Sequence, residues 1–252
     1  MRIVSYGQTD VGLKREGNED NYICNDALGL FAVADGMGGH VAGEVASKTA
    51  VDTLSEFIRK HLEENPALEQ TESIEHYVSI FEDGVQEANR AICEMSNENA
   101  GMNGMGTTFS GFLVNQDQAA MAHVGDSRIY RLRDGDFATL TIDHSWVQEQ
   151  LERNIITPEE AKVHRWRNVI TRALGNRTIL EVDTDVIEFL PGDRYLMCSD
   201  GLTGMVDDEM LGGMLAELGH DLEDAGEAMI KKANQAGGED NITLVLLRID
   251  EE

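Results

Sequence analysis

The sequence predicts an α+β fold in which layered β-sheets are covered by helices on their outer faces. Apolar residues recur at helical spacing in two pairs of segments, one pair near each end of the chain. Short apolar or alternating runs bounded by Gly, Asn and Asp lie around and between these pairs. No internal repeat or linker divides the 252 residues, so we expect a single domain over residues 1–252.

The first part of the chain alternates strands with two long helices. Leu28–Ala34 is apolar almost throughout, which is typical of a strand covered on both faces. A Gly-rich loop follows at 36–39 and leads into the first helix. We expect strands at 4–9, 21–24 and 28–35, and helices at 41–61 and 73–97.

The remainder is richer in strands. Asp134-Gly135-Asp136 is typical of a hairpin turn between two of them. We expect strands at 107–115, 118–124, 127–133, 137–140, 182–189, 194–199 and 242–249. We expect helices at 144–153, 158–163, 207–218 and 222–235.

The composition excludes several classes of protein. A formal net charge of -27 argues against binding to nucleic acid or to an anionic membrane surface, because both would repel the chain. The N-terminus lacks the apolar core of a signal peptide, and no apolar run is long enough to cross a bilayer. Cys24, Cys93 and Cys198 show neither disulfide nor zinc spacing, so we expect a cytoplasmic protein. The acidity indicates either a solvated surface or a carboxylate-rich site that needs cations.

Aspartates recur where apolar strands end. Asp35, Asp126 and Asp200 each follow an apolar run beside Gly or Ser, and Asp240 directly precedes another run. One such Asp is usually a turn residue. Several of them at the ends of buried strands indicate a site, because a core holds strand ends rigidly.

Convergent carboxylates would need a cation, since close like charges cannot all stay ionised. An all-oxygen donor set favours Mg²⁺ or Mn²⁺ over Zn²⁺. Two such ions bridged by one Asp activate water for in-line attack, which suits a phosphate monoester. Arg15, just before the acidic pair Glu19-Asp20, is either a surface residue or a bidentate clamp for that phosphate.

A series of motifs carries a family resemblance over about residues 9–247. In order they are Thr9-Asp-Val-Gly-Leu-Lys-Arg15-Glu-Gly-Asn-Glu19-Asp20, Val33-Ala-Asp35-Gly-Met-Gly-Gly-His40, Gly106-Thr-Thr108, His123-Val-Gly-Asp126-Ser-Arg128, Asp143-His-Ser145, Ser199-Asp200-Gly-Leu202 and Asp240-Asn241-Ile-Thr243. The series resembles the metal-dependent PPM, or type 2C, serine/threonine protein phosphatases in their compact bacterial form. The resemblance implies two antiparallel sheets packed as a sandwich between helices, a four-layer αββα fold.

The resemblance also implies a metal centre of two Mn²⁺ or Mg²⁺ ions. Asp35 would bridge both ions, and the carbonyl of Gly36 would join the first. Asp200 and Asp240 would complete the shell of the second. Asp126, together with Asp200, would hold a third, weaker ion.

The same resemblance implies supporting roles for further residues. Glu19 and Asp20 would hold metal-bound waters, and Arg15 would bind the substrate phosphate. Asn241 would support the last metal ligand.

Two parts of the chain depart from the animal pattern or vary within the family. Animal members carry a candidate general-acid His two residues after the bridging Asp, where this chain has Met37. The nearby His40 is either such an acid or a structural residue at a helix N-terminus. The segment at about 145–168 would be a mobile flap, and its Arg165-Trp166-Arg167 is a candidate docking patch for phosphopeptide.

The implied activity is hydrolysis of phosphoserine and phosphothreonine in other proteins. Partners would be phosphorylated substrates, in a signalling role opposed to a cognate serine/threonine kinase. The alternative is an inactive module of the same fold that only binds or regulates, although inactive relatives usually lack a metal carboxylate or the phosphate-binding Arg, and both are present here.

Other mechanisms lack their required residues. No Cys is followed six residues later by the Arg of a cysteine-based phosphatase. Gly38 and Gly43 have P-loop spacing, but Glu44 follows instead of Lys. No EF-hand loop is present that would indicate a cation buffer.

Overall fold

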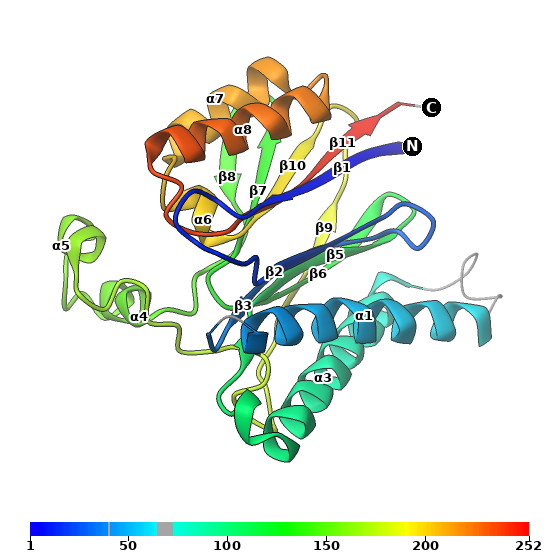
Figure 1. The fold of residues 1–252 in the computed structure, drawn as a ribbon. Coiled ribbons are helices and arrows are strands. Elements are labelled where there is room, and N and C mark those ends of the chain that lie inside the picture. The colour runs from blue at the N-terminus through cyan, green and yellow to red at the C-terminus, as the bar shows by residue number, and fades with distance from the viewer. Residues whose placement is uncertain (40, 65–72, 252) are drawn as a thin grey trace.

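Two antiparallel sheets lie face to face, with helices on both outer faces (Figure 1). This computed structural model describes residues 1–39, 41–64 and 73–251. Separate apolar clusters fill the space between the sheets and the space under each helical layer. The four-layer αββα arrangement expected from the sequence is therefore confirmed.

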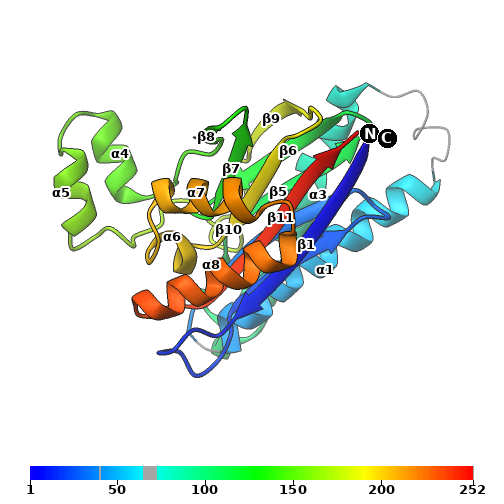
Figure 2. The same cartoon turned by 90° about the horizontal axis from the view of Figure 1, so that it is seen from above.

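The five-stranded sheet joins both ends of the chain. Its order is β1 (Arg2–Asp10), β11 (Ile242–Asp250), β10 (Arg194–Cys198), β7 (Arg128–Arg133) and β8 (Asp136–Thr139). Because β1 pairs antiparallel with β11 from Arg2↔Asp250 to Asp10↔Ile242, the two termini lie side by side (Figure 2). Positive φ angles at Asp134 and Gly135 close the expected hairpin between β7 and β8.

The six-stranded sheet contains the strands of the first motifs. Its order is β2 (Asp20–Asn25), β3 (Leu30–Met37), β5 (Phe109–Asn115), β6 (Gln118–Val124) and β9 (Asp183–Glu188), with β4 (Gly106–Thr107) paired to the end of β3. Alternate residues of β3 pack on opposite faces, Leu30 and Ala32 toward the helices and Phe31 and Val33 toward the other sheet. This explains why the first five residues of the strand, Leu30–Ala34, are all apolar.

In the described part of the chain, four helices form the outer layers. Helices α1 (Val41–Glu64) and α3 (Ile74–Glu98) cover the six-stranded sheet, and α7 (Asp208–Leu218) and α8 (Leu222–Ala236) cover the five-stranded sheet. The buried face of α1 includes Ala46, Ala50, Leu54 and Ile58 at the spacing that predicted a helix. No helix in the described ranges has the length and apolar character needed to span a bilayer.

A segment carrying α4 (Trp146–Glu152) and α5 (Pro158–Val163) protrudes from one end of the sandwich between β8 and β9 (Figures 1 and 2). Thr157 and Glu160 form a reciprocal capping box at the start of α5. The Trp146 ring stacks on His164 with centroids 4.6 Å apart. The two short helices predicted here are confirmed.

The structure differs from the sequence prediction at three points. The strand expected at 107–115 is interrupted at Thr108, because β4 pairs with Gly36–Met37 whereas β5 pairs with Leu30–Val33. Two short elements were not expected, the 3₁₀ helix η1 (Ala100–Met102) and α6 (Asp200–Thr203). Asp35 lies inside β3 rather than after its end.

A buried ion pair secures the end of β7 that lies away from the α4–α5 segment. Arg133 donates two hydrogen bonds of 2.7 and 2.6 Å to the carboxylate of Asp193, whose side chain is 1% exposed. Tyr195 and the backbone amide of Leu190 also donate to this carboxylate. The carboxylate is thus fully hydrogen-bonded, as a buried charge requires.

The inter-sheet core predicts a large penalty for truncating Phe112. Its ring is fully buried and meets the rings of Phe189 and Tyr195 edge-on, with centroids 5.5 and 5.4 Å away. Phe112→Ala should lower the free energy of unfolding by about 3–5 kcal/mol in urea titrations followed by circular dichroism. Phe112→Leu fills more of the space and should lose less, and equal losses for the two variants would contradict this packing.

Candidate metal centre

Two of the predicted carboxylates lie next to each other in the six-stranded sheet. Asp20 is the first residue of β2 and is the direct partner of Asp35 on β3. Residues directly opposite each other in an antiparallel pair extend to the same face of the sheet. The strand register therefore brings these two side chains together at one end of the sandwich.

The other carboxylates arrive from strand ends in the facing sheet and from the crossover between the sheets. Asp200 begins α6 directly after β10, Asp240 precedes β11, and Asp126 follows β6 after Gly125. Gly201 allows the backbone after Asp200 to lie close to the backbone after Asp240. A Cβ at Gly201 would lie 1.9 Å from the carbonyl oxygen of Asn241.

The five aspartates lie close enough to act on one another, with Asp240, whose side chain is 35% exposed, at the rim of the group. Burial raises the pKa of Asp35 well above its usual range, and the charges of Asp20, Asp200, Asp126 and Asp240 raise it further. Burial and then the charge of Asp200 raise the pKa of Asp126 to about 8. Burial and then Asp240 raise the pKa of Asp200, although its hydrogen bond with Asp35 opposes the shift. The sequence-predicted carboxylates therefore do converge.

Hydroxyl groups of the five-stranded sheet hold Asp20 in place. Ser199 Oγ donates a 2.8 Å hydrogen bond to its carboxylate, and the side chain of Thr243 bonds to it as well. Burial nevertheless raises the pKa of Asp20 to about 7, against the effect of these two bonds. The contact ties the two sheets together at the site, and neither hydroxyl was assigned a role from the sequence.

Asn241 organises the loop that precedes β2. Its Nδ2 donates to the carbonyls of Val11 and Gly17, both at 2.9 Å, and its Oδ1 accepts from the amide of Glu19 at 2.8 Å. One buried side chain thus fixes both ends of the segment that carries Arg15. This arrangement agrees with a supporting function for Asn241, and it acts on the loop as well as on the adjacent Asp240.

Glu19 packs against the start of α1. A Cβ on Gly43 would lie 1.8 Å from Glu19 Oε2, and a Cβ on Gly36 would lie 2.3 Å from the Glu19 carbonyl. Both glycines are therefore needed for the acidic side chain to lie between β3 and the helix. Of the two glycines with P-loop spacing, Gly43 serves this close packing.

Arg15 lies at the rim and bonds directly to a predicted metal ligand. Its Nη2 is 2.6 Å from Asp240 Oδ2, and its side chain is 48% exposed. The other oxygen of Asp240 accepts from the amide of Asn241 at 2.8 Å. Arg15 is thus a guanidinium at the edge of the carboxylate cluster rather than an isolated surface residue.

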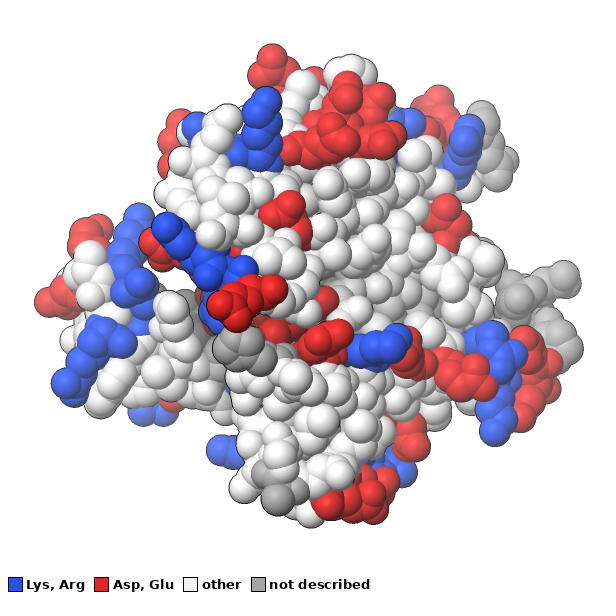
Figure 3. Space-filling view, in the orientation of Figure 1, with Lys and Arg blue, Asp and Glu red and all other residues white. Residues whose placement is uncertain are grey.

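Two further predictions concern His40 and the candidate docking patch at 165–167. His40 falls outside the described residues. In the α4–α5 segment, the Arg165 guanidinium lies over the Trp166 ring at 4.5 Å, and Trp166 also meets Trp146 edge-on. Basic side chains gather over this segment at the left of Figure 3, whereas acidic ones predominate over α7 and α8 at the top.

The donor set fits hard divalent cations. Five carboxylates lie close together, so their ionised forms repel one another, and cations would remove that repulsion. Asp126 Oδ1 is buried and has no hydrogen-bond partner in the described part of the chain. Within residues 1–39, 41–64 and 73–251, no three His, Cys, Asp or Glu side chains are arranged to hold a metal ion by themselves, so carbonyl and water oxygens would have to contribute ligands.

The chain is similar to known proteins over nearly its whole length. A family model described as protein phosphatase 2C matches residues 16–243. The serine/threonine phosphatase stp of Listeria monocytogenes serotype 4b is 41% identical over 246 residues, which cover 96% of this chain and 94% of the relative. The protein phosphatase PhpP of Streptococcus pneumoniae serotype 2 is 36% identical, with 97% of this chain and 96% of the relative covered.

Solved structures show the same fold. The serine/threonine phosphatase PstP/Ppp of Mycobacterium tuberculosis superimposes with a TM-score of 0.88 at 34% identity and covers 99% of both chains. A catalytic domain of the serine/threonine protein phosphatase PstP in complex with two manganese ions superimposes with a TM-score of 0.86 at 33% identity, again over 99% of both chains.

The repulsion within the cluster predicts opposite effects of one substitution with and without metal. In EDTA, Asp35→Asn should raise the melting temperature by about 2–4 °C for each kcal/mol of repulsion that it removes. Mn²⁺ at one hundred times its dissociation constant should stabilise the unaltered chain by about 2.7 kcal/mol and the variant far less. Differential scanning calorimetry measures both effects.

Asp117→Asn, in the β5–β6 turn, is the control and should keep the full stabilisation by Mn²⁺. Equal stabilisation of Asp35→Asn and of the unaltered chain by Mn²⁺ would contradict the ligand role.

Proposed function

We propose a division of roles within the carboxylate cluster of this chain, which belongs to the protein phosphatase 2C family. The chain is a metal-dependent protein-serine/threonine phosphatase, and its substrates are phosphoproteins. One observation supports the residue roles above all others. Five aspartates from distant parts of the sequence meet at one end of the sandwich, with the guanidinium of Arg15 at the edge of the group.

The ions would be Mn²⁺ or Mg²⁺. Asp35 would contact both catalytic ions, the Gly36 carbonyl would join the first, and Asp200 and Asp240 would complete the second. Asp126 with Asp200 would hold a third, weaker ion. When bound, such ions lower the pKa of a water molecule and neutralise charge on the phosphate.

Glu19 and Asp20 would orient water at the centre. Both lie where the loop at 10–19 enters β2, and Asp20 is held on the other side by Ser199. A carboxylate fixed in this way can keep accepting hydrogen bonds from water in one orientation.

Arg15 would bind the substrate phosphate. Its guanidinium offers a planar fork of donors that matches two phosphate oxygens. Its exposure at the rim makes it accessible to a phosphorylated side chain of another protein. The Asn241 bonds to Val11 and Gly17 would keep its loop in position.

The reaction then balances as a hydrolysis. Water adds to phosphorus, the bond from phosphorus to the serine or threonine oxygen breaks, and that oxygen takes up a proton. Met37, at the position of the candidate acid in animal relatives, has no proton to give. We propose that water supplies this proton.

The cellular setting follows from the same reasoning. We propose that residues 1–252 form one catalytic domain whose α4–α5 segment is the flap at about 145–168. The protein would act in the cytoplasm and oppose a cognate serine/threonine kinase by dephosphorylating its targets.

Removing one shared ligand should stop catalysis without unfolding the chain. Asp200→Asn should lower Mn²⁺-dependent turnover of p-nitrophenyl phosphate and of a phosphothreonine peptide by roughly 10³-fold, because charge neutralisation by metal contributes several kcal/mol to the barrier. Steady-state kinetics with circular dichroism checks both parts. Full Mn²⁺-dependent activity in Asp200→Asn would refute its role, and an unaltered chain without activity would favour an inactive binding module.

The phosphate-binding role of Arg15 predicts a selective loss. Arg15→Ala should raise the KM for phosphopeptide by about 10–100-fold, since hydrogen bonds to charged groups contribute about 1.5–3 kcal/mol. Mn²⁺ affinity from isothermal titration calorimetry should fall much less. Arg15→Lys keeps the charge but loses the fork, so its KM should lie between the two. An unchanged KM in Arg15→Ala would count against the clamp.

A further inference from the structure

The loop Gly125–Arg128, here called the Asp126 loop, crosses from one sheet to the other. It leaves β6 of the six-stranded sheet and enters β7 of the five-stranded sheet. Asp126 is the member of the carboxylate cluster that this crossover carries. Its position therefore depends on whatever fixes the loop between the two sheets.

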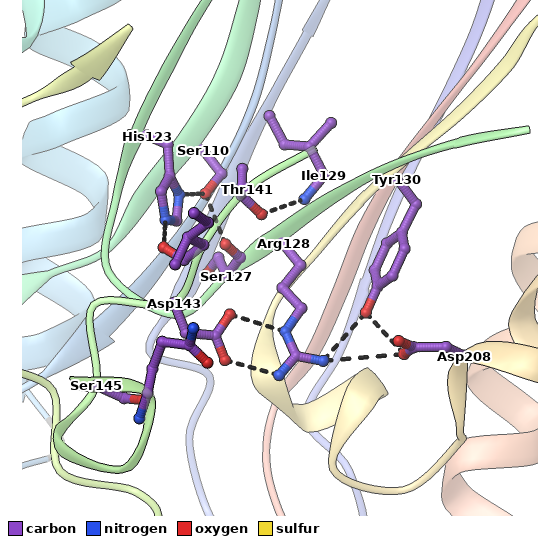
Figure 4. Close-up of polar contacts among 12 residues, drawn as sticks. Ser110, His123, Ser127, Arg128, Ile129, Tyr130, Thr141, Asp143, Ser145 and Asp208 are labelled. Carbon is purple, nitrogen blue, oxygen red and sulfur yellow. Dashed lines mark hydrogen bonds and ion pairs between the residues drawn. The ribbon is translucent and has the colours of Figure 1, made fainter. Parts of the chain in front are cut away.

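Hydroxyl groups of β5 and the residue before it fix one side of this loop. Thr108 Oγ1 and Ser127 Oγ share a 2.7 Å hydrogen bond. Ser110 Oγ donates to the Ser127 carbonyl at 2.9 Å (Figure 4). Thr108 Oγ1 also accepts from the backbone amide of Asp35 at 2.9 Å. The residue after Asp126 is thus connected to the strand that carries Asp35.

An arginine fork fixes the end of the loop. Arg128 donates from Nε and Nη2 to the two oxygens of Asp143, at 2.8 and 2.7 Å. Figure 4 shows the guanidinium between Asp143 on one side and Tyr130 and Asp208 on the other. Asp143 lies two residues before Ser145, the N-cap of α4. The same pair therefore joins β7 to the root of the α4–α5 segment.

The next residue, His144, fixes the beginning of the loop. Its backbone amide donates to the Gly125 carbonyl at 2.7 Å, and the Gly125 amide donates to His144 Nδ1 at 3.0 Å. Because Nδ1 accepts, the ring proton lies on Nε2, which is 3.1 Å from Asp183 Oδ2. Arg172 bonds to the other oxygen of Asp183 at 2.5 Å and holds this carboxylate in place.

Every neighbour of Asp126 is thus held, while one oxygen of its own carboxylate is left without a partner. Gly125 is bound by His144, Ser127 by Thr108 and Ser110, and Arg128 by Asp143. Among the buried side-chain nitrogen and oxygen atoms of this loop, all of which is described, only Asp126 Oδ1 has no hydrogen-bond partner. A purely structural crossover does not require an unpartnered buried carboxylate oxygen.

We propose that Asp143, acting through Arg128, and His144 are positioning residues that hold the Asp126 carboxylate in place for the weaker third cation. The inference rests on the proposed function, which makes Asp126 a ligand of that ion. It adds that the ligand is fixed from the root of the α4–α5 segment as well as from the β5 side of the loop. Residues that orient metal ligands in this way typically change metal affinity by about 10–100-fold when mutated.

Mn²⁺ binding by the full chain tests the proposal. Arg128→Lys is the main variant, because it keeps the positive charge near Asp126 and removes the fork to Asp143. Asp143→Asn is the second variant and replaces it if Arg128→Lys does not fold. Asp193→Asn is the matched control, since it disrupts a comparable bidentate pair at the opposite end of β7. Isothermal titration calorimetry gives the affinities, and circular dichroism gives the melting temperatures.

Arg128→Lys should weaken the weakest Mn²⁺ site by about 10-fold or more, as Asp126→Asn should. The two substitutions combined should weaken it no further than Asp126→Asn alone, because both act through one carboxylate. Asp193→Asn should lower the melting temperature and leave Mn²⁺ affinity within about twofold of the unaltered chain.

Three results would overturn the positioning role: Arg128→Lys with unchanged affinity, additive losses in the combined variant, or an equal loss in Asp193→Asn. A different result would locate the fault in the proposed function. If Asp126→Asn leaves Mn²⁺ binding unchanged, Asp126 is not a ligand, and the inference falls with that assignment.

Discussion

Repulsion among enclosed aspartates is the constraint around which the site end of this sandwich is organised. Burial and like charge oppose the ionised forms of Asp20, Asp35, Asp126 and Asp200. The carboxylates can nevertheless stay close because each is carried by backbone that other contacts hold. Strand pairing fixes Asp20 against Asp35, and Gly201 lets the turn after β10 lie against Asn241. Hard cations then relieve the repulsion that this arrangement creates.

The register of the strands determines where the carboxylates are placed relative to one another. Side chains alternate along a strand, so a slip of one residue in the pairing of β2 with β3 would move Asp20 away from Asp35. The apolar residues of β3 prevent the slip, because Phe31 and Val33 would leave the inter-sheet core with it. The same packing that stabilises the sandwich therefore aligns the carboxylates. Most of the net charge of -27 lies elsewhere, over surfaces such as α7 and α8 (Figure 3).

Periodicity predicted the elements well and their contacts poorly. The runs that became β3, α1 and β11 show their secondary structure locally, whereas α6 is too short to show any period. The interruption at Thr108 was missed because it arises from β4 and β5 pairing with different parts of β3. The ordered motifs identified the convergent aspartates, but the Arg15–Asp240 and Arg128–Asp143 pairs join residues 225 and 15 positions apart, and no local pattern encodes them.

The α4–α5 segment has two parts: a root whose residues contact the Asp126 loop, and an outer end that is exposed. At the root, an isolated antiparallel β-bridge pairs Ser145 with Ile170, so the chain entering the segment lies beside the chain leaving it. The Trp146 amide also donates to the Val169 carbonyl at 2.8 Å. Farther out, Ile155 and Val163 are largely exposed. Changes at the exposed end can therefore alter what the segment contacts without disturbing the Asp126 loop. A change at the root acts on that loop directly, because Asp143 and His144 bind residues on both sides of Asp126.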